Sequence, residues 1–259
     1  MSASADFARR DGAALEVCVE TVAGLHAAVG GGADRIELCA ALSVGGLTPP
    51  ASLIRAAAAA PLPVHLLARP SAGGFVYDAA EQALIADDIR TAAEAGLAGV
   101  VIGASTGRHT LDVALLARWV DLARTLGDAR GTPLSLTLHR AFDLVPDAID
   151  ALEQSIALGF DRILTSGCTP RAIDGVATLA LLHARADGRI IILAGSGVNA
   201  TTAPAILATG IRELHASCRG VRPVDEASPE RRFGFVGTDT AMTDPIRVND
   251  LARIIHLTA

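Results

Sequence analysis

The chain has 259 residues, a net charge of -6 and a hydrophobic fraction of 51%, and it contains four cysteines. Its acidic balance, with no basic run, argues against general binding to nucleic acid or to an anionic membrane. No apolar stretch reaches the roughly 18 residues of a membrane span, and the cysteines are too few for a secreted disulfide scaffold. We therefore expect a cytoplasmic protein whose residues 1–13 form an N-terminal tail without a hydrophobic signal core.

Lysine is absent from the chain, and all 22 basic residues are arginine. Schiff-base chemistry needs a side-chain amine, and the Walker A phosphate loop needs its lysine. The sequence therefore excludes both kinds of site.

Eight short apolar runs alternate with eight helical patterns along the chain. The runs are residues 15–20, 35–40, 64–69, 99–104, 134–140, 162–167, 189–195 and 213–218. The helical patterns are residues 21–29, 49–60, 78–95, 112–126, 146–158, 171–186, 200–209 and 248–257. Strict alternation over eight units predicts an α/β fold, a single-domain TIM-type (βα)8 barrel over residues 1–259, with an open doubly wound sheet as the alternative.

Local signals mark the ends of several of these elements. Thr48 before Pro49, and Asp78 with Glu81 three residues later, are typical of helix starts. A glycine near positions 32, 96, 159 and 210 precedes a strand and suits a helix C-terminus. Residues 219–245 show no clear periodicity, so we expect a long loop before the last helix, as a lid, an ordered surface excursion or a loose segment.

Alternate strand positions face the lumen of a barrel, and here many of the expected inner positions are polar. The predicted inner residues are Glu16, Cys18, Glu20, Glu37, Cys39, His65, Arg69, Thr137, His139, Glu213, His215 and Ser217. Barrel lumens are normally filled by branched apolar side chains, and sites lie at the C-terminal ends of the strands. The pattern predicts a functional site, with a network of ion pairs, such as Glu37 with Arg69, as the simpler alternative.

The cysteines of the first two strands occupy matching positions in two Glu-x-Cys runs. Cys18 and Cys39 would lie on neighbouring strands, with imidazoles in reach, which suits a soft metal such as Cu(I) or Zn(II). Alternatively, both are buried thiols that pack as small hydrophobes. Cys168 and Cys218 lie at strand ends and are weaker candidates.

Seven motifs in order resemble the CutC copper homeostasis family over roughly residues 15–219. They are EVCVE at 16–20, GGADRIELC at 31–39, GGLTP at 45–49, LHRAFD at 138–143, RILTSG at 162–167, GSGV at 195–198 and ELHAS at 213–217. The resemblance implies a TIM-type barrel, a cytosolic location, copper handling, self-association, and Cu(I) ligands at Cys18 and Cys39. Two positions depart from the family pattern: the run that follows Arg69 lacks a second arginine, and Val44 stands where an acidic residue is usual.

A second set of residues suits an anion. The loops after strands six and seven carry Ser166, Gly167, Gly195 and Gly197, which predict an anion-binding site for a phosphorylated ligand, or else tight turns only. The GSGVNA run at 195–200 also matches a dinucleotide fingerprint, but it lacks the acidic residue that would bind a ribose.

These groups support an alternative function, a TIM-barrel enzyme that acts by acid–base chemistry on a small metabolite, phosphorylated or not. Its catalytic residues would be His139, His65 and Glu37, which move protons, and Arg69, which holds an oxyanion. Arg140 could share that role or form a rim ion pair with Asp143.

Overall fold

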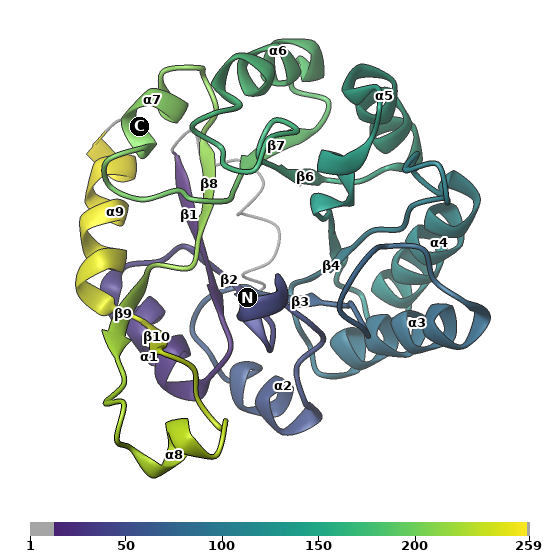
Figure 1. Cartoon of the computed structure of the whole chain (residues 1–259). Helices are drawn as coiled ribbons and strands as arrows, with labels where there is room; N and C mark the ends of the chain where they lie inside the picture. Colours follow the sequence, from purple (N-terminus) through teal and green to yellow (C-terminus); the bar gives the residue numbers. More distant parts are fainter. Residues whose placement is uncertain (1–12, 258–259) are drawn as a thin grey trace.

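A computed structural model describes residues 13–257 of the chain. Eight parallel strands close into a barrel in chain order, from β1 round to β8, and Figure 1 shows the helices placed around it. The closed barrel confirms the TIM-type (βα)8 fold and excludes the open sheet. The expected N-terminal tail lies, apart from Ala13, outside the described residues.

The barrel strands are β1 (Ala14–Val19), β2 (Arg35–Leu38), β3 (Val64–Leu67), β4 (Gly99–Ile102), β5 (Ser135–Leu138), β6 (Arg162–Thr165), β7 (Ile191–Ala194) and β8 (Glu213–Ala216). The helices are α1 (Val22–Gly31), α2 (Ala51–Ala57), α3 (Ala79–Glu94), α4 (Val113–Ala129), α5 (Ala148–Leu158), α6 (Val176–Ala186), α7 (Ala203–Leu207), α8 (Pro229–Arg232) and α9 (Pro245–Leu257). Two short 3-10 turns, η2 (Leu42–Val44) and η3 (Arg140–Leu144), follow β2 and β5. Most strands are shorter than the sequence predicted because their last residues leave the sheet to form the rim.

Capping explains where several helices begin and end. Asp78 and Glu81 form the predicted capping box of α3, and Gly32 and Gly159 end α1 and α5 in the left-handed conformation. The prediction of Thr48 as the cap of α2 is wrong, because α2 begins after Pro50. The Thr48 hydroxyl instead accepts from the Arg69 amide at 2.9 Å and donates to Asp88 at 2.7 Å.

The barrel wall separates two apolar clusters, and this separation tests the predicted inner face. The large outer cluster contains the side chains that alternate with the predicted inner ones, such as Val17, Ile36 and Leu66. A small inner cluster contains Cys18, Cys39, Leu67 and Val101. The strand parity expected from the sequence is therefore confirmed for the two cysteines.

Residues 219–245 contain an ordered hairpin. Strand β9 (Arg219–Pro223) pairs antiparallel with β10 (Asp239–Thr243), and α8 lies in the connection. The hairpin lies beside α1, at the lower left of Figure 1, and an ion pair of 3.2 Å joins Arg219 to Glu20. The hairpin is an ordered surface excursion, and none of its residues lines the cavity that opens at the C-terminal ends of the barrel strands. Within residues 13–257, every helix is too short or too polar to span a bilayer.

Candidate functional site

A cavity of about 330 Å³ opens at the C-terminal ends of the barrel strands. Its polar lining comes from strand ends and the loops that follow them: Cys18, Glu37, Arg69, His139, Arg140, Ser196, His215 and Ser217. Six of these side chains were predicted to face the lumen. Small-molecule sites commonly occupy this end of the fold, so the cavity is the candidate site.

Three potential metal ligands converge on one wall of the cavity. One donor atom each from Cys18, Glu37 and His215 lies within 4.8 Å of the other two. The β1–β2 register sets Cys18 beside Glu37, and the β1–β8 pairing that closes the barrel brings in His215. The sequence suggested imidazoles near Cys18 but did not single out this trio.

The electrostatics of these three residues are tightly linked. Burial raises the pKa of Glu37 to about 7, although the nearby His215 acts in the opposite direction. Burial alone would lower the pKa of His215, but attraction to Cys18 and Glu37 and a hydrogen bond with Glu16 raise it well above its ordinary value. The site can therefore gain or lose protons when a ligand binds.

Cys39 lies just behind this wall. It is fully buried and packs with Cys18, Leu67 and Val101, and its Sγ donates to the Val19 carbonyl at 3.4 Å. Burial raises the pKa of the Cys39 thiol far above the usual range. Cys39 is thus a neutral thiol beside Cys18, and it does not line the cavity itself.

Arg69 forms a second wall, and it does not pair with Glu37 as the ion-pair alternative proposed. Its Nη1 donates to the carbonyls of Val44 at 2.9 Å and Gly46 at 2.8 Å, and its Nη2 donates to Gly73 at 2.9 Å. The guanidinium also lies 5.3 Å from the centre of the Phe75 ring. Arg69 follows the end of β3, so its side chain bonds to carbonyl groups of the rim loops and not to the carboxylate of Glu37, which lies within β2.

His139 stands next to Arg69 on this second wall. Its Nδ1 accepts a hydrogen bond from the Ala141 amide at 3.1 Å, and its ring lies 4.6 Å from that of Phe75. Burial and the neighbouring Arg69 lower the pKa of His139 to about 3. His139 is therefore neutral, with its proton on Nε2, an atom that is buried and has no partner among the described residues.

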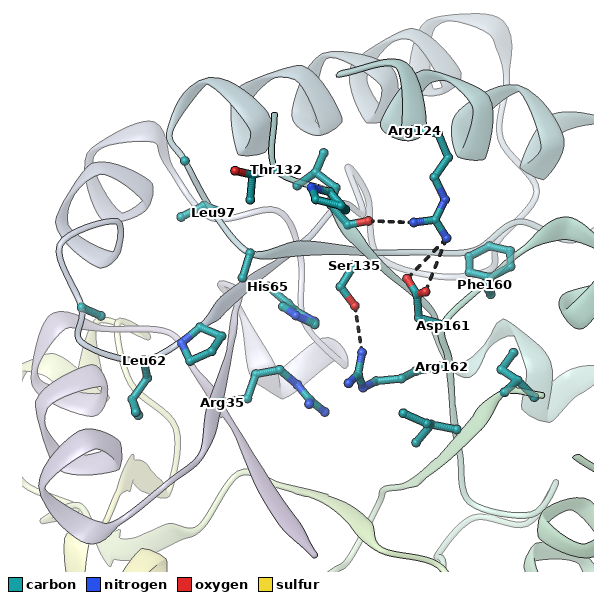
Figure 2. A pocket seen from close by; sticks show the side chains of 18 of the residues that line it. Arg35, Leu62, His65, Leu97, Arg124, Thr132, Ser135, Phe160, Asp161 and Arg162 are labelled. Carbon is teal, nitrogen blue, oxygen red and sulfur yellow. Dashed lines mark hydrogen bonds and ion pairs between the residues drawn. The ribbon is translucent and has the colours of Figure 1, made fainter. Parts of the chain in front are cut away.

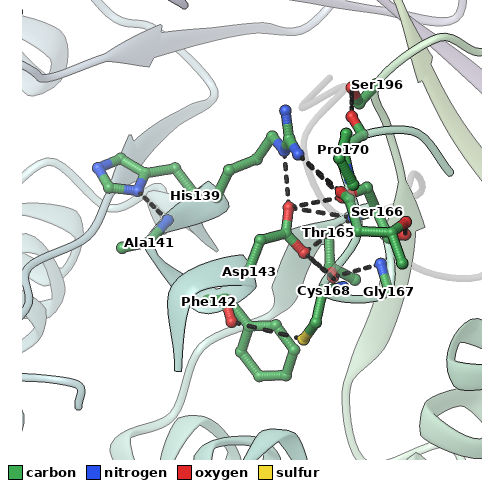
Figure 3. A network of polar contacts seen from close by, with 12 residues as sticks. His139, Ala141, Phe142, Asp143, Thr165, Ser166, Gly167, Cys168, Pro170 and Ser196 are labelled. Atoms are coloured by element: carbon green, nitrogen blue, oxygen red, sulfur yellow. Dashed lines mark hydrogen bonds and ion pairs between the residues drawn. The ribbon is translucent and has the colours of Figure 1, made fainter. Parts of the chain in front are cut away.

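The rim after β6 is held by one carboxylate, Asp143 (Figure 3). Asp143 accepts from Arg140 at 2.7 Å, from the Thr165 hydroxyl at 2.5 Å and from the amides of Ser166 and Cys168. This confirms the rim ion pair of Arg140 with Asp143.

The anion site predicted at Ser166, Gly167, Gly195 and Gly197 stays a prediction, but most of its donors are engaged. The Gly167 amide donates to the Thr165 hydroxyl and the Gly195 amide to the Thr165 carbonyl, both at 2.9 Å. The amides of residues 196–198 make no such bond in the described chain, and these residues line the cavity. The amides that are free to donate are therefore those of residues 196–198, within the GSGV turn.

A network of ion pairs fills the barrel below the cavity. Glu16 pairs with Arg35, and Glu213 accepts from Arg35 at 2.6 Å and from Arg162 at 2.8 Å. The sequence reasoning missed both arginines, although the parity that turned Glu37 inward also turns Arg35 inward. The predicted ion-pair network exists, with different members and in a lower layer.

His65 belongs to this lower layer and not to the upper cavity. It lines a separate cavity of about 750 Å³ at the N-terminal end of the barrel, shown in Figure 2 together with Arg35 and Arg162. Burial, followed by the repulsion of Arg35, lowers the pKa of His65 to about 3. The structure therefore brings together His139, Glu37 and Arg69 of the four proposed catalytic residues, and places His65 elsewhere.

The chain is similar to known proteins over most of its length. Residues 13–220 match the model of the CutC family. A CutC family protein of Agrobacterium fabrum is 49% identical over 242 residues, covering 93% of each chain. One from Vibrio cholerae is 45% identical over 249 residues, covering 95% of this chain and 96% of its own.

One solved structure shows the same relationship, and a second shows the fold alone. The crystal structure of CutC from Streptococcus agalactiae, whose name assigns it to copper homeostasis, has a TM-score of 0.73 and 30% identity, over 79% of this chain and 98% of its own. The thiamine phosphate pyrophosphorylase of Pyrococcus furiosus, at 12% identity and a TM-score of 0.57, shares the fold alone. The chain therefore belongs to the CutC family.

Proposed function

We propose that this protein serves copper homeostasis by binding Cu(I) in the barrel mouth, with Cys18, Cys39 and His215 as the ligands. Cys18 and Cys39 are the ligands that the family resemblance implies, and the position of His215 near Cys18 supports adding it as a third ligand. The observation that carries the proposal is the position of Cys18, which belongs both to the trio with Glu37 and His215 and to the inner cluster with Cys39.

The donor set fits the chemistry of Cu(I). Thiolate sulfur and imidazole nitrogen suit this soft ion, whereas a carboxylate oxygen suits it less well. We therefore treat Glu37 as a neighbour of the metal and not as one of its ligands. A Zn(II) ion would use Glu37 as a ligand more readily, so substitution of Glu37 distinguishes the two metals.

Competition for Cu(I) tests the assignment. Anaerobic, metal-free protein is titrated with Cu(I) in the presence of a chromophoric chelator, and the variants Cys18→Ser, Cys39→Ser and His215→Gln are compared with the unsubstituted protein. We expect the affinity to fall at least about tenfold in each, because each loses one of the donors that suit Cu(I). Cys168→Ser is the matched control, since Cys168 lies at the rim beside Asp143. Unchanged affinity in the double variant of Cys18 and Cys39 would refute the assignment.

The cytosolic location and the self-association that the family resemblance implies belong to the same proposal. Fractionation of cells that produce the tagged protein tests the location, with recovery in the membrane or secreted fraction as the contrary result. Light scattering after gel filtration tests self-association, and a mass of 26.5 kDa, that of a single chain, would argue against it.

A second candidate function, acid–base catalysis, is favoured by one feature of the cavity. Glu37, the neutral imidazole of His139 and the guanidinium of Arg69 all line it. Such an enzyme would transfer a proton to or from a small carbonyl metabolite. Exchange of substrate hydrogens with D₂O, followed by NMR and lost in Glu37→Gln, would support this function, and no exchange across phosphorylated and carboxylated carbonyl compounds would count against it.

A further inference from the structure

Arg69 places an uncompensated positive charge in the wall of the cavity. Arg69 is 5% exposed, yet the three hydrogen bonds of its side chain all go to neutral carbonyl oxygens. Within residues 13–257 no carboxylate forms an ion pair with it, unlike the buried Arg35 and Arg162, which share Glu213. A buried charge is costly unless a counter-charge accompanies it. The environment of Arg69 therefore suits an anion supplied from outside the chain.

His139 adds an oriented hydrogen-bond donor next to this charge. The Ala141 amide occupies Nδ1, which leaves the proton on Nε2, and the ring lines the same cavity. The absence of a side chain at Gly103 makes room for the ring, since a Cβ there would lie 2.4 Å from Nδ1. Because His139 is 4% exposed and its Nε2 has no partner in the described chain, an acceptor atom of a ligand would satisfy it.

Backbone amides supply a third set of donors across the cavity. Ser196 and Gly197 have φ angles of 79° and 71°, and the amides of residues 196–198 make no backbone bond in the described chain. The turn is fixed by its other groups: the Ser196 carbonyl accepts from Ala172 at 2.9 Å, and its hydroxyl donates to Pro170 at 2.7 Å. Successive amides left free to donate in a turn of this kind are a common feature of anion sites.

We propose that the barrel mouth binds a small organic oxyanion, a carboxylate or phosphate compound, through the charge of Arg69, the Nε2–H of His139 and the amides of Ser196 and Gly197. The cavity of about 330 Å³ is at the small end of the range of ligand sites. This binding goes beyond Cu(I) binding and uses different residues, so either activity can fail without the other.

Titration of metal-free protein with two probe anions tests the proposal. Inorganic phosphate and malonate are added separately at pH 7.5, with sodium chloride of equal ionic strength as the blank, and binding is followed by calorimetry and thermal unfolding. At 100-fold the dissociation constant we expect the melting temperature to rise by about 5 °C or more. Binding of phosphate alone would identify a phosphorylated ligand, and binding of malonate alone a carboxylate. Failure of both probes to bind saturably would overturn the proposal.

Two substitutions locate the bound probe. His139→Asn keeps an acceptor for the Ala141 amide, because asparagine is a good helix cap, but removes the Nε2 donor. Arg69→Gln removes the charge, and Arg189→Gln removes an equal charge from a surface ion pair with Glu153. We expect affinity to fall at least about tenfold in His139→Asn and Arg69→Gln and to be unchanged in Arg189→Gln.

Unchanged affinity in His139→Asn would overturn the site even if Arg69→Gln failed to fold. Cys39→Ser, a change behind the cavity wall and not in its lining, is measured in parallel and separates this proposal from the copper site. That variant should bind the anion normally and lose only its affinity for Cu(I).

Discussion

Nδ1 of His215 lies 2.8 Å from Oε1 of Glu16, across the seam where β8 meets β1. This contact fixes the ring, and Nε2 then lies 3.9 Å from Glu37, on the side of the barrel that holds Cys18. A carboxylate that orients a metal-binding imidazole is a common arrangement in proteins. Glu16 is therefore a positioning residue of the proposed copper site.

Glu16→Gln should weaken Cu(I) binding by about 10–100-fold, the usual effect of losing such a partner. Glu213→Gln is the matched control: it also removes a carboxylate from Arg35, and among the described residues Glu213 forms no hydrogen bond or ion pair with His215. Both variants should lose stability, and only Glu16→Gln should lose affinity in the chelator competition. Equal affinity losses in the two variants would show that the effect is general destabilisation.

Copper binding should strengthen as the pH rises. Burial holds the pKa of Cys39 far above the usual range, so the thiol keeps its proton until the metal displaces it. Each proton released on binding makes the apparent affinity rise by up to about tenfold per pH unit. Chelator competition between pH 6 and 8 measures this slope, which should be shallower in Cys39→Ser. Equal slopes in the two proteins would show that Cys39 is not a ligand.

The ion-pair layer predicts a defined loss of stability in acid. Burial alone would raise the pKa of Glu213, but Arg35 and Arg162 lower it to about 2. Because the folded pKa lies below the unfolded one, the stabilisation is complete above about pH 4.5 and is lost as the pH falls toward 2. Its size is about 3 kcal/mol from the shift in pKa.

Urea unfolding of the unsubstituted protein and of Glu213→Gln, from pH 7 down to pH 3, measures this contribution. The difference between their free energies of unfolding should be largest at pH 7 and should shrink as the pH falls. A difference that does not change with pH would mean that the charge of Glu213 contributes nothing to the stability.

Gly103 should tolerate no side chain. A Cβ at this position would lie 2.4 Å from the His139 ring, and relieving such a clash in a packed interior costs about 1–3 kcal/mol. Gly103→Ala should therefore lower the free energy of unfolding and weaken anion binding without removing any donor. Gly107→Ala is the control, since a Cβ there meets nothing within 4 Å. Equal anion affinity in both variants would contradict the placement of His139.

The sequence predicted the barrel well because the relevant signals are local. Helix ends at Gly32 and Gly159, the capping box at Asp78 and the alternation of polar and apolar residues depend on neighbours in the chain. The same alternation predicted that Cys18, Glu37 and His215 face the lumen, although alternation alone does not show that they lie together. The prediction of Thr48 as a helix cap is wrong because its hydroxyl bonds to Arg69 and Asp88, which belong to other βα units.

The contacts between strands could not be predicted in this way. His215 meets Glu16 only because the barrel closes between β8 and β1, 199 positions apart in sequence, and parity does not give the stagger of strands. His65 and His139 have the same parity yet lie in different cavities, because His65 lies near the start of β3 and His139 just after the end of β5. The carbonyl partners of Arg69 depend on the path of the rim loops, which periodicity does not report.

X-ray absorption at the copper edge of the Cu(I)-loaded protein reports the atoms bound to the metal, and it therefore decides whether Cys18, Cys39 and His215 hold it. We expect a coordination shell dominated by sulfur from Cys18 and Cys39, with one nitrogen from His215 that disappears in His215→Gln. A shell of nitrogen and oxygen alone, unchanged when both cysteines are replaced by serine, would contradict this expectation.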